Sequence, residues 1–149
     1  MYKIEEDNSI ETLKECLPLA LEHYNEVEDK ASSVPFKINF ATLETMAKLG
    51  MLSVVVARKE KVVVGYFANI ITEDFMTSQL SGKELAIYVS PEHRGGRLFY
   101  KLLQASEKAL VKRGVTTQYI TFKAGHNVTM PLRCGFEHTE TTYQKILEV

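Results

Sequence analysis

The N-terminal part of the chain shows a short alternating pattern followed by a helical one. Residues 2–6 alternate moderately between apolar and polar side chains, which predicts a short strand. Apolar residues then recur at helical spacing over residues 10–24, and Asn8 or Ser9 can cap this helix with a side-chain oxygen. Pro18 interrupts the pattern, so we expect the helix to kink or restart there.

A second helix and a hairpin are predicted next. Asn39 is placed to cap a helix with an apolar face, and Gly50 is placed to end it in a left-handed conformation. Two segments rich in Val and Ile, residues 52–58 and 61–72, predict strands. The charged residues 58–61 between them predict a tight hairpin.

The second half of the chain continues with alternating element types. We expect a polar connection, a strand, an amphipathic helix, a strand, a short helical or irregular piece and a final strand, over residues 73–82, 84–90, 98–113, 116–123, 127–134 and 135–147. Pro91 stops the first of these strands, and Gly114 is placed to end the helix.

This order of elements is typical of an α+β (mixed α/β) fold with a mostly antiparallel twisted sheet. The unit formed by residues 84–123 predicts a right-handed βαβ crossover, whose two strands must be parallel. There is no internal repeat, low-complexity tract or linker, so we expect a single domain over residues 1–149.

Composition is that of an ordinary globular domain, with 45% hydrophobic residues in 149, enough for a core without disulfides. Cys16 and Cys134 lie far apart and form no Cys-x-x-Cys pair, which favours neither a disulfide framework nor a zinc ribbon. The acidic start lacks a signal-like apolar region, and the apolar runs are too short to cross a bilayer. We therefore expect a cytoplasmic protein with no membrane partner.

Charge is unevenly distributed along the chain. The net charge of −1 argues against general nucleic-acid binding, which needs clustered positive charge. Residues 1–30 carry nine acidic and three basic side chains, whereas residues 31–149 carry 10 acidic and 15 basic ones. Solvated faces are the simpler interpretation, and a binding face is the alternative.

The junction between the predicted strand of residues 84–90 and the amphipathic helix contains Arg94-Gly95-Gly96-Arg97. Glycines let a backbone approach a phosphate closely, and the first N–H groups of a helix lack internal partners. The junction thus predicts an anion cradle, to which the two arginines can add charge-assisted hydrogen bonds. A plain glycine-rich turn with surface arginines fits this stretch equally well, and neither a P-loop nor a Gly-x-Gly-x-x-Gly motif is present.

The segment YVSPEHRGGRLFYKLL resembles the signature of the GNAT acyl-CoA N-acetyltransferases, including some phage-encoded members. The matching residues are Val89, Pro91, Glu92, Arg94, Gly95, Leu102 and Leu103, with Gly65-Tyr66 and Gly135-Phe136 as further similarities. Arg97 and Phe99 depart from the signature, which has small residues there. The resemblance implies a GNAT-like sheet of about six to seven strands flanked by about four helices.

The resemblance also implies which residues bind acetyl-CoA as the co-substrate, without a metal. Backbone N–H groups would bind the pyrophosphate from Arg94, Gly95, Gly96, Arg97, Leu98 and Phe99. Ile87 and Val89 would expose backbone groups to the pantetheine arm and polarise the thioester carbonyl. Asn127 would either reach CoA or cap a helix.

Catalytic residues are implied less completely. Glu84 is the candidate general base that takes a proton from the acceptor ammonium, with ordered water and a merely solvent-facing carboxylate as alternatives. Pro131 stands where the family has the tyrosine that protonates the CoA thiolate. Tyr143, His126 and Cys134 are the substitutes, in that order of preference.

These implications predict an N-acetyltransferase that moves an acetyl group to a primary amine by direct attack in a ternary complex. The acceptor, a small molecule or a lysine-bearing protein, is expected to be cationic because acidic residues gather near the expected cleft, at Glu22, Glu26, Glu28 and Asp29. We expect a monomer or a homodimer. An inactive acyl-CoA-binding or protein-interaction module is the main alternative, and nucleic-acid binding through the basic side of the long helix is a weaker one.

Overall fold

The computed structural model describes residues 1–28, 33–125 and 128–148. The chain forms two compact units, residues 1–119 and 120–149, which are described separately below. The expectation of a single domain over the whole chain therefore stays a prediction. None of the described helices is long and apolar enough to cross a membrane.

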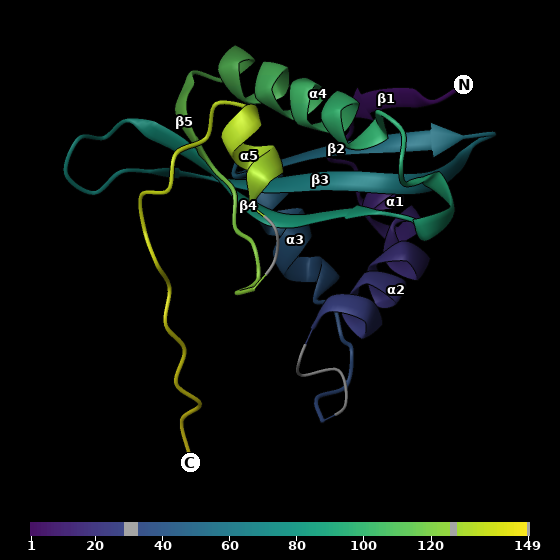
Figure 1. Ribbon diagram of the computed structural model, residues 1–149, viewed down its shortest axis with the longest axis horizontal. Helices are drawn as coiled ribbons and strands as arrows, with labels where there is room; N and C mark the ends of the chain where they lie inside the picture. Colours follow the sequence, from purple (N-terminus) through teal and green to yellow (C-terminus); the bar gives the residue numbers. More distant parts are fainter. Residues whose placement is uncertain (29–32, 126–127, 149) are drawn as a thin grey trace. The chain divides into compact units, whose positions relative to one another are not determined.

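The first unit is built on a mixed sheet with strand order β1-β2-β3-β4-β5 (Figure 1). Its strands are β1 (Lys3–Glu6), β2 (Leu52–Lys59), β3 (Val62–Glu73), β4 (Leu80–Val89) and β5 (Val115–Tyr119). The first four strands pair antiparallel, and β5 pairs parallel to β4 across the predicted crossover. The mostly antiparallel mixed α/β architecture is thus confirmed.

Helices cover both faces of this sheet. One face carries α1 (Ile10–Glu15), α2 (Leu17–Val27) and α3 (Phe40–Lys48), and the other carries α4 (Leu98–Lys112). A short 3₁₀ turn, η2 (Pro91–His93), links β4 to α4. The second unit contains α5 (Thr129–Arg133).

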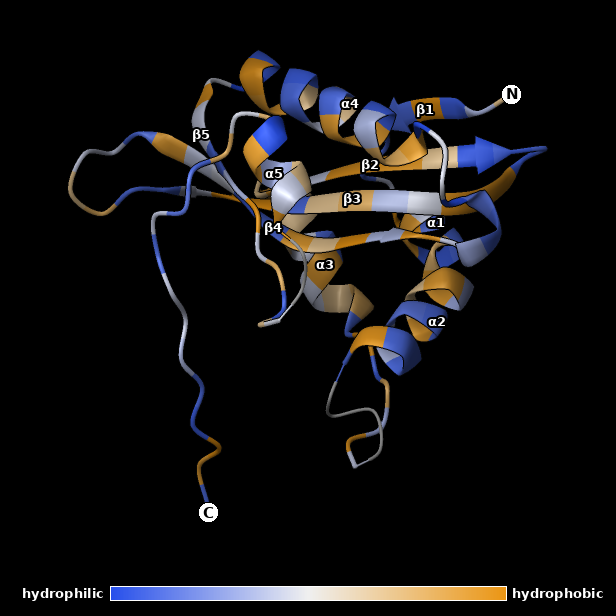
Figure 2. Cartoon of the chain, in the orientation of Figure 1, coloured by the Kyte–Doolittle hydropathy of each residue, from blue (hydrophilic) through white to orange (hydrophobic). Residues whose placement is uncertain are grey.

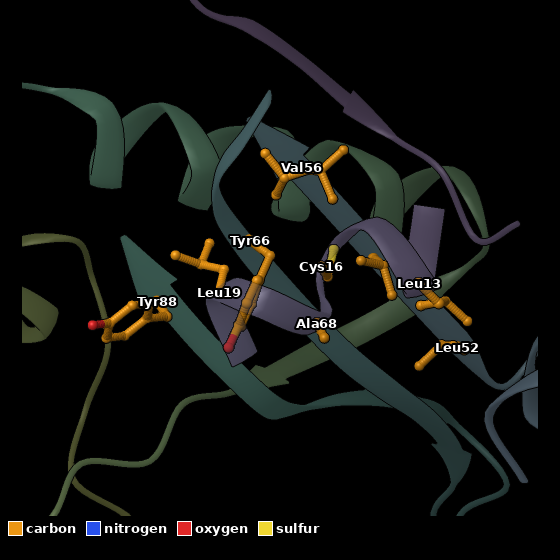
Figure 3. Close-up of a cluster of buried hydrophobic side chains, with 10 residues drawn as sticks. Leu13, Cys16, Leu19, Leu52, Val56, Tyr66, Ala68 and Tyr88 are labelled. Atoms are coloured by element: carbon orange, nitrogen blue, oxygen red, sulfur yellow. The ribbon is translucent and has the colours of Figure 1, made fainter. Parts of the chain in front are cut away.

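The core on the α1–α3 face joins both N-terminal helices to the middle of the sheet (Figure 3). Its buried members include Leu13, Cys16, Leu19, Leu52, Val56, Tyr66, Ala68 and Tyr88. Burial of such side chains contributes roughly 1.5–3 kcal/mol each when it is complete. Figure 2 shows the corresponding hydrophobic stretches of β2 and β3 and their hydrophilic hairpin end.

The core on the α4 face depends on two glycines of the sheet. Leu102 and Leu110 of α4 are fully buried. A Cβ at Gly65 would lie 3.1 Å from Leu102, and one at Gly82 would lie 2.9 Å from Leu110. The helix therefore approaches β3 and β4 as closely as it does because both positions lack a side chain.

The predicted helix signals are confirmed locally. Ser9 caps α1 by accepting the N–H of Thr12, and Asn39 caps α3 in the same way. The first helix restarts at Pro18, since α1 ends at Glu15 and α2 begins at Leu17. Gly50 has φ +73° after α3, as a left-handed terminator should.

Three predictions about strands were wrong. The strand predicted over residues 116–123 ends at Tyr119, as β5. The connection between β3 and β4 spans residues 74–79 rather than 73–82, because the Asp74 carboxylate accepts the N–H groups of Met76 and Thr77 and closes a tight turn. The predicted strand over residues 135–147 is not formed, since a strand needs a ladder partner and the described part of the second unit provides none. The described residues accordingly form five strands and five α-helices, rather than the six to seven strands and about four helices that the resemblance implied.

Candidate functional site

The ladder between β4 and β5 is short. It runs from the Leu80–Val115 pair to the Lys83–Tyr119 pair. Residues 84–89 of β4 therefore have no ladder partner on that edge among the described strands. An unpaired strand edge presents a row of main-chain donors and acceptors that a ligand or another strand can use.

A β-bulge lies where this open edge begins. The register of β3 with β4 shifts between the Ala68–Ala86 pair and the Asn69–Glu84 pair, which leaves Leu85 as the extra residue. Bulges bend the strand that carries them and increase its twist. The bulge is thus placed to turn the second half of β4 away from the direction set by its pairing with β5.

The open edge exposes the main chain of two predicted residues. The N–H of Ser90 donates to the carbonyl of Val64 at 2.9 Å, across the β3–β4 ladder. Main-chain groups of successive strand residues point to opposite edges, so those of Tyr88 face β3 as those of Ser90 do. Those of Ile87 and Val89 therefore face the open edge.

The loop after β4 leads directly into the N-terminus of α4. Gly95 has φ +87°, which a residue with a side chain adopts only at a cost. Arg97 occupies the N-cap position of α4 and makes no capping hydrogen bond through its side chain. The N–H groups of residues 98–100 have no acceptor within the helix, so this end of α4 attracts anions.

A cleft of about 240 Å³ opens between this loop and the open strand edge. It is lined by Ile87, Tyr88, Val89, His93, Arg94, Gly95, Gly96 and Phe99. The cleft thus brings together most of the predicted strand and loop residues, whereas Arg97 and Leu98, which were also predicted, do not line it. Phe99, at a position where small residues were expected, lines the cleft without filling it.

Arg94 is directed toward α2 by several contacts. Its guanidinium donates to both carboxylate oxygens of Glu26, at 2.9 and 2.7 Å, and Nε donates to the Val89 carbonyl at 2.8 Å. It also lies over the Tyr88 ring, 5.1 Å from the centroid. The Arg94 N–H donates to the Pro91 carbonyl at 3.3 Å, so the loop N–H groups beginning at Gly95 are the ones left for an anion.

Glu84 lies at the bulge, where β4 begins to run unpaired. Its side chain is half-buried, unlike that of a solvent-facing edge carboxylate. Burial, with a smaller contribution from the nearby Glu28 carboxylate, raises the pKa of Glu84 to about 7. A carboxyl group with this pKa can both accept and release a proton near neutral pH.

Residues 13–136 match the model of the acetyltransferase (GNAT) family. The chain belongs to the GNAT family. No curated protein sequence matches it. The uncapped helix end, the glycine at positive φ and the open β4 edge therefore belong to a GNAT fold, as the motif around Arg94 predicted.

Solved structures share this fold at low sequence identity. Glucosamine-6-phosphate N-acetyltransferase from Arabidopsis thaliana is 14% identical, with a TM-score of 0.75 and 99% of each chain covered. An aminoglycoside acetyltransferase from an uncultured soil metagenomic sample, in complex with sisomicin, is 13% identical, with a TM-score of 0.78 over 99% of this chain and 97% of the other. A putative acetyl transferase from Pyrococcus furiosus is 20% identical, with a TM-score of 0.73 over 99% and 100%.

An aromatic cluster beside the GNAT loop was not predicted. The Nδ1 of His23 on α2 lies 2.7 Å from the Tyr66 hydroxyl, and its ring stacks on Tyr88 at 4.6 Å and 13°. Burial lowers the pKa of His23, and burial together with the Glu26 carboxylate raises the pKa of Tyr88 to about 12. Single aromatic residues on separate elements form no motif, so only the shared sheet face of the two tyrosines could have indicated the cluster.

The second half of the proposed GNAT machinery is less complete. Tyr143 is 88% exposed in the second unit, and Pro131 and Cys134 lie in and just after α5. Asn127 and His126 are outside the described residues. The roles suggested for these residues stay predictions.

Proposed function

We propose that this GNAT protein is an acetyl-CoA-dependent N-acetyltransferase that acetylates a primary amine by direct attack in a ternary complex. The observation that carries the proposal is the short β4–β5 ladder, which leaves an open strand edge beside the uncapped N-terminus of α4. Together they offer main-chain donors for an extended chain and for an anion within one cleft.

The chain's own groups fit the co-substrate in two places. The N–H groups from Gly95 to Phe99 would hold the pyrophosphate, assisted by the dipole of α4. The main-chain groups of Ile87 and the N–H of Val89 would pair with the pantetheine arm and donate to the thioester carbonyl. One such donor typically stabilises the negative charge that develops on the carbonyl oxygen in the transition state by about 2.7–4 kcal/mol. Acetyl-CoA supplies the activated acetyl group.

The proton of the acceptor ammonium requires a base, because only the free amine has a lone pair for attack. Glu84 would take this proton, since its pKa of about 7 lets it be ionised in a large fraction of molecules at neutral pH. It would then release the proton to solvent. Tyr143 remains the proposed proton donor to the departing thiolate.

We infer that the acceptor is cationic, a small molecule or a lysine side chain. Glu28, the C-cap residue of α2, and the nearby Glu84 form an acidic environment at the end of the helix expected to border the acceptor. Acidic groups concentrate cationic substrates and increase their association rate. Two proteins of similar fold are named as acetyltransferases of glucosamine-6-phosphate and of aminoglycosides, which supports an amine acceptor for this chain.

The test is thiol release from acetyl-CoA with a panel of polyamines, aminoglycosides and lysine peptides, alongside calorimetric titration with CoA. We expect binding of CoA and turnover with at least one cationic amine. Absence of CoA binding would remove the proposed function.

A second candidate is an acyl-CoA-binding module without turnover. It is favoured by Pro131, which occupies the position of the family's proton-donating tyrosine and has no donor. In that case titration would show CoA binding while no amine of the panel accelerated thiol release.

A further inference from the structure

The contacts of Arg94 connect three elements at one end of the cleft. Arg94 belongs to the loop, Val89 and Tyr88 to the end of β4, and Glu26 to the last turn of α2. Arg94 contacts all three other residues, through a hydrogen bond, a ring contact and a bidentate ion pair. Bidentate pairing fixes the orientation of a guanidinium as well as its position.

We propose that Glu26 is a positioning residue for coenzyme binding, which holds the loop of residues 90–97 in its binding conformation through Arg94. This inference rests on the proposed function, because the bound ligand is CoA. The Glu26 carboxylate itself does not line the cleft.

Two observations indicate that Arg94 acts by fixing the conformation of the loop and not by supplying positive charge to the ligand. Its hydrogen bonds to Glu26 lower the pKa of that carboxyl to about 2, so the pair stays ionised and its net charge is zero. The Nε of Arg94 donates to the Val89 carbonyl, so the Arg94 side chain folds back along the end of β4. The attraction of the cleft for a diphosphate then comes from main-chain N–H groups that the loop must present in one arrangement.

The Arg94–Glu26 ion pair is also supported by the stacking of His23 on Tyr88. His23, one turn before Glu26 on α2, stacks on the same Tyr88 ring that Arg94 covers. The Tyr88 hydroxyl is buried close to the Glu26 carboxylate, which helps to raise its pKa, but it reaches no described partner at hydrogen-bond distance. Tyr88 therefore contributes chiefly through its ring, as a platform between α2 and the loop.

A charge substitution gives a test with a clear sign. CoA is anionic, so removal of a nearby negative charge should by electrostatics alone tighten its binding or leave it unchanged. If Glu26 positions the loop, Glu26→Gln should weaken CoA binding about tenfold, because one charged bidentate pair is lost. Glu22→Gln is the matched control, since Glu22 is an exposed carboxylate one turn earlier on the same helix.

We would measure CoA binding by calorimetry and the Michaelis constants of both substrates for the two variants and the wild type. Glu26→Gln should raise KM for acetyl-CoA about tenfold with kcat changed by less than about twofold, whereas Glu22→Gln should leave KM for acetyl-CoA at or below the wild-type value. Glu26→Asp, which keeps the charge on a shorter chain, should lie between Glu26→Gln and the wild type.

Amide hydrogen exchange in the free protein gives an independent readout. Residues 90–97 should exchange faster in Glu26→Gln than in Glu22→Gln, while exchange in β2 and β3 stays the same in both. Equal CoA affinity and equal loop exchange in the two variants would overturn the positioning role and leave the proposed function intact. A wild-type protein that does not bind CoA would overturn both.

Discussion

At the scale of single residues, the proposed chemistry depends on the protonation of Glu84. The group's pKa is raised from 4.5 to about 7 in the folded chain, first by burial and then by Glu28. A raised carboxyl pKa means that the stabilising contribution of the protonated form is fully present below pH 4.5. It is lost as the pH rises through about 7.

Glu84→Gln should therefore separate catalysis from stability. We expect kcat/KM to fall about 10²–10⁴-fold, because the base is removed. We expect the free energy of unfolding at pH 8 to rise by up to about 3 kcal/mol, because Gln carries no half-buried charge. Thiol-release kinetics and urea titration measure the two effects.

The pH profile provides the control for this substitution. The wild-type log kcat/KM should rise with pH and level off above a midpoint near 7, the pKa of Glu84 in the free protein. A Glu84→Gln variant that keeps this midpoint, or keeps its rate, would show that another group removes the proton.

Many single-residue features could be predicted because they act locally. Ser9 and Asn39 cap helices through hydrogen bonds to residues three positions later, and Gly50 and Gly114 end helices at positive φ. The engagement of Arg94 by Glu26 joins residues 68 positions apart, and no local rule indicates it. The contact of His23 with Tyr66 could not be predicted either, because these residues are also far apart in the sequence.

At the scale of elements, the loop before α4 depends on the backbone of Gly95. Gly95→Ala should lower the free energy of unfolding by about 1–2 kcal/mol, because φ +87° is strained for any residue with a Cβ. Gly96 has no positive φ and no atom near its missing Cβ, so Gly96→Ala should be neutral or stabilising by up to about 1 kcal/mol. Equal losses in both variants, measured by urea denaturation, would contradict this explanation.

The two-residue loop of the β2–β3 hairpin is a place where a substitution should stabilise the protein. Glu60 and Lys61 form its two-residue loop with φ +51° and +70°, conformations that suit Asn and Gly better. Lys61→Gly should raise the free energy of unfolding by about 1 kcal/mol. Lys59→Gly, one step before the loop in β2, should lower it by roughly 0.5–1 kcal/mol, and the same sign for both would refute the turn argument.

Element prediction failed where pairing decides the outcome. The Val-rich strands β2 and β3 follow from their composition, since each is buried and flanked by partners. The Thr- and Tyr-containing residues 135–147 have comparable strand character and form no strand, because propensity supplies no ladder hydrogen bonds. The open edge of β4 likewise depends on where the pairing with β5 stops, which the sequence of β4 does not encode.

At the scale of the molecule, charge is separated along the chain. The first 30 residues hold nine of the 19 acidic side chains, and α2 lies among them. If these carboxylates attract the acceptor, kcat/KM for a diamine should fall about two- to tenfold between 50 and 500 mM salt. An amino acid of equal chain length serves as the control and should change less, and a salt effect of equal size on both would count against a cationic acceptor.

Residues 84–89 of β4, which have no partner on one side among the described strands, make the protein prone to aggregation in storage. A free strand border of this kind is a template on which a second molecule can add its own strand, and such addition leads to aggregates. Whatever occupies that border in the working protein also shields it. Preparations kept with coenzyme A should therefore remain clear longer, by light scattering, than preparations kept without it.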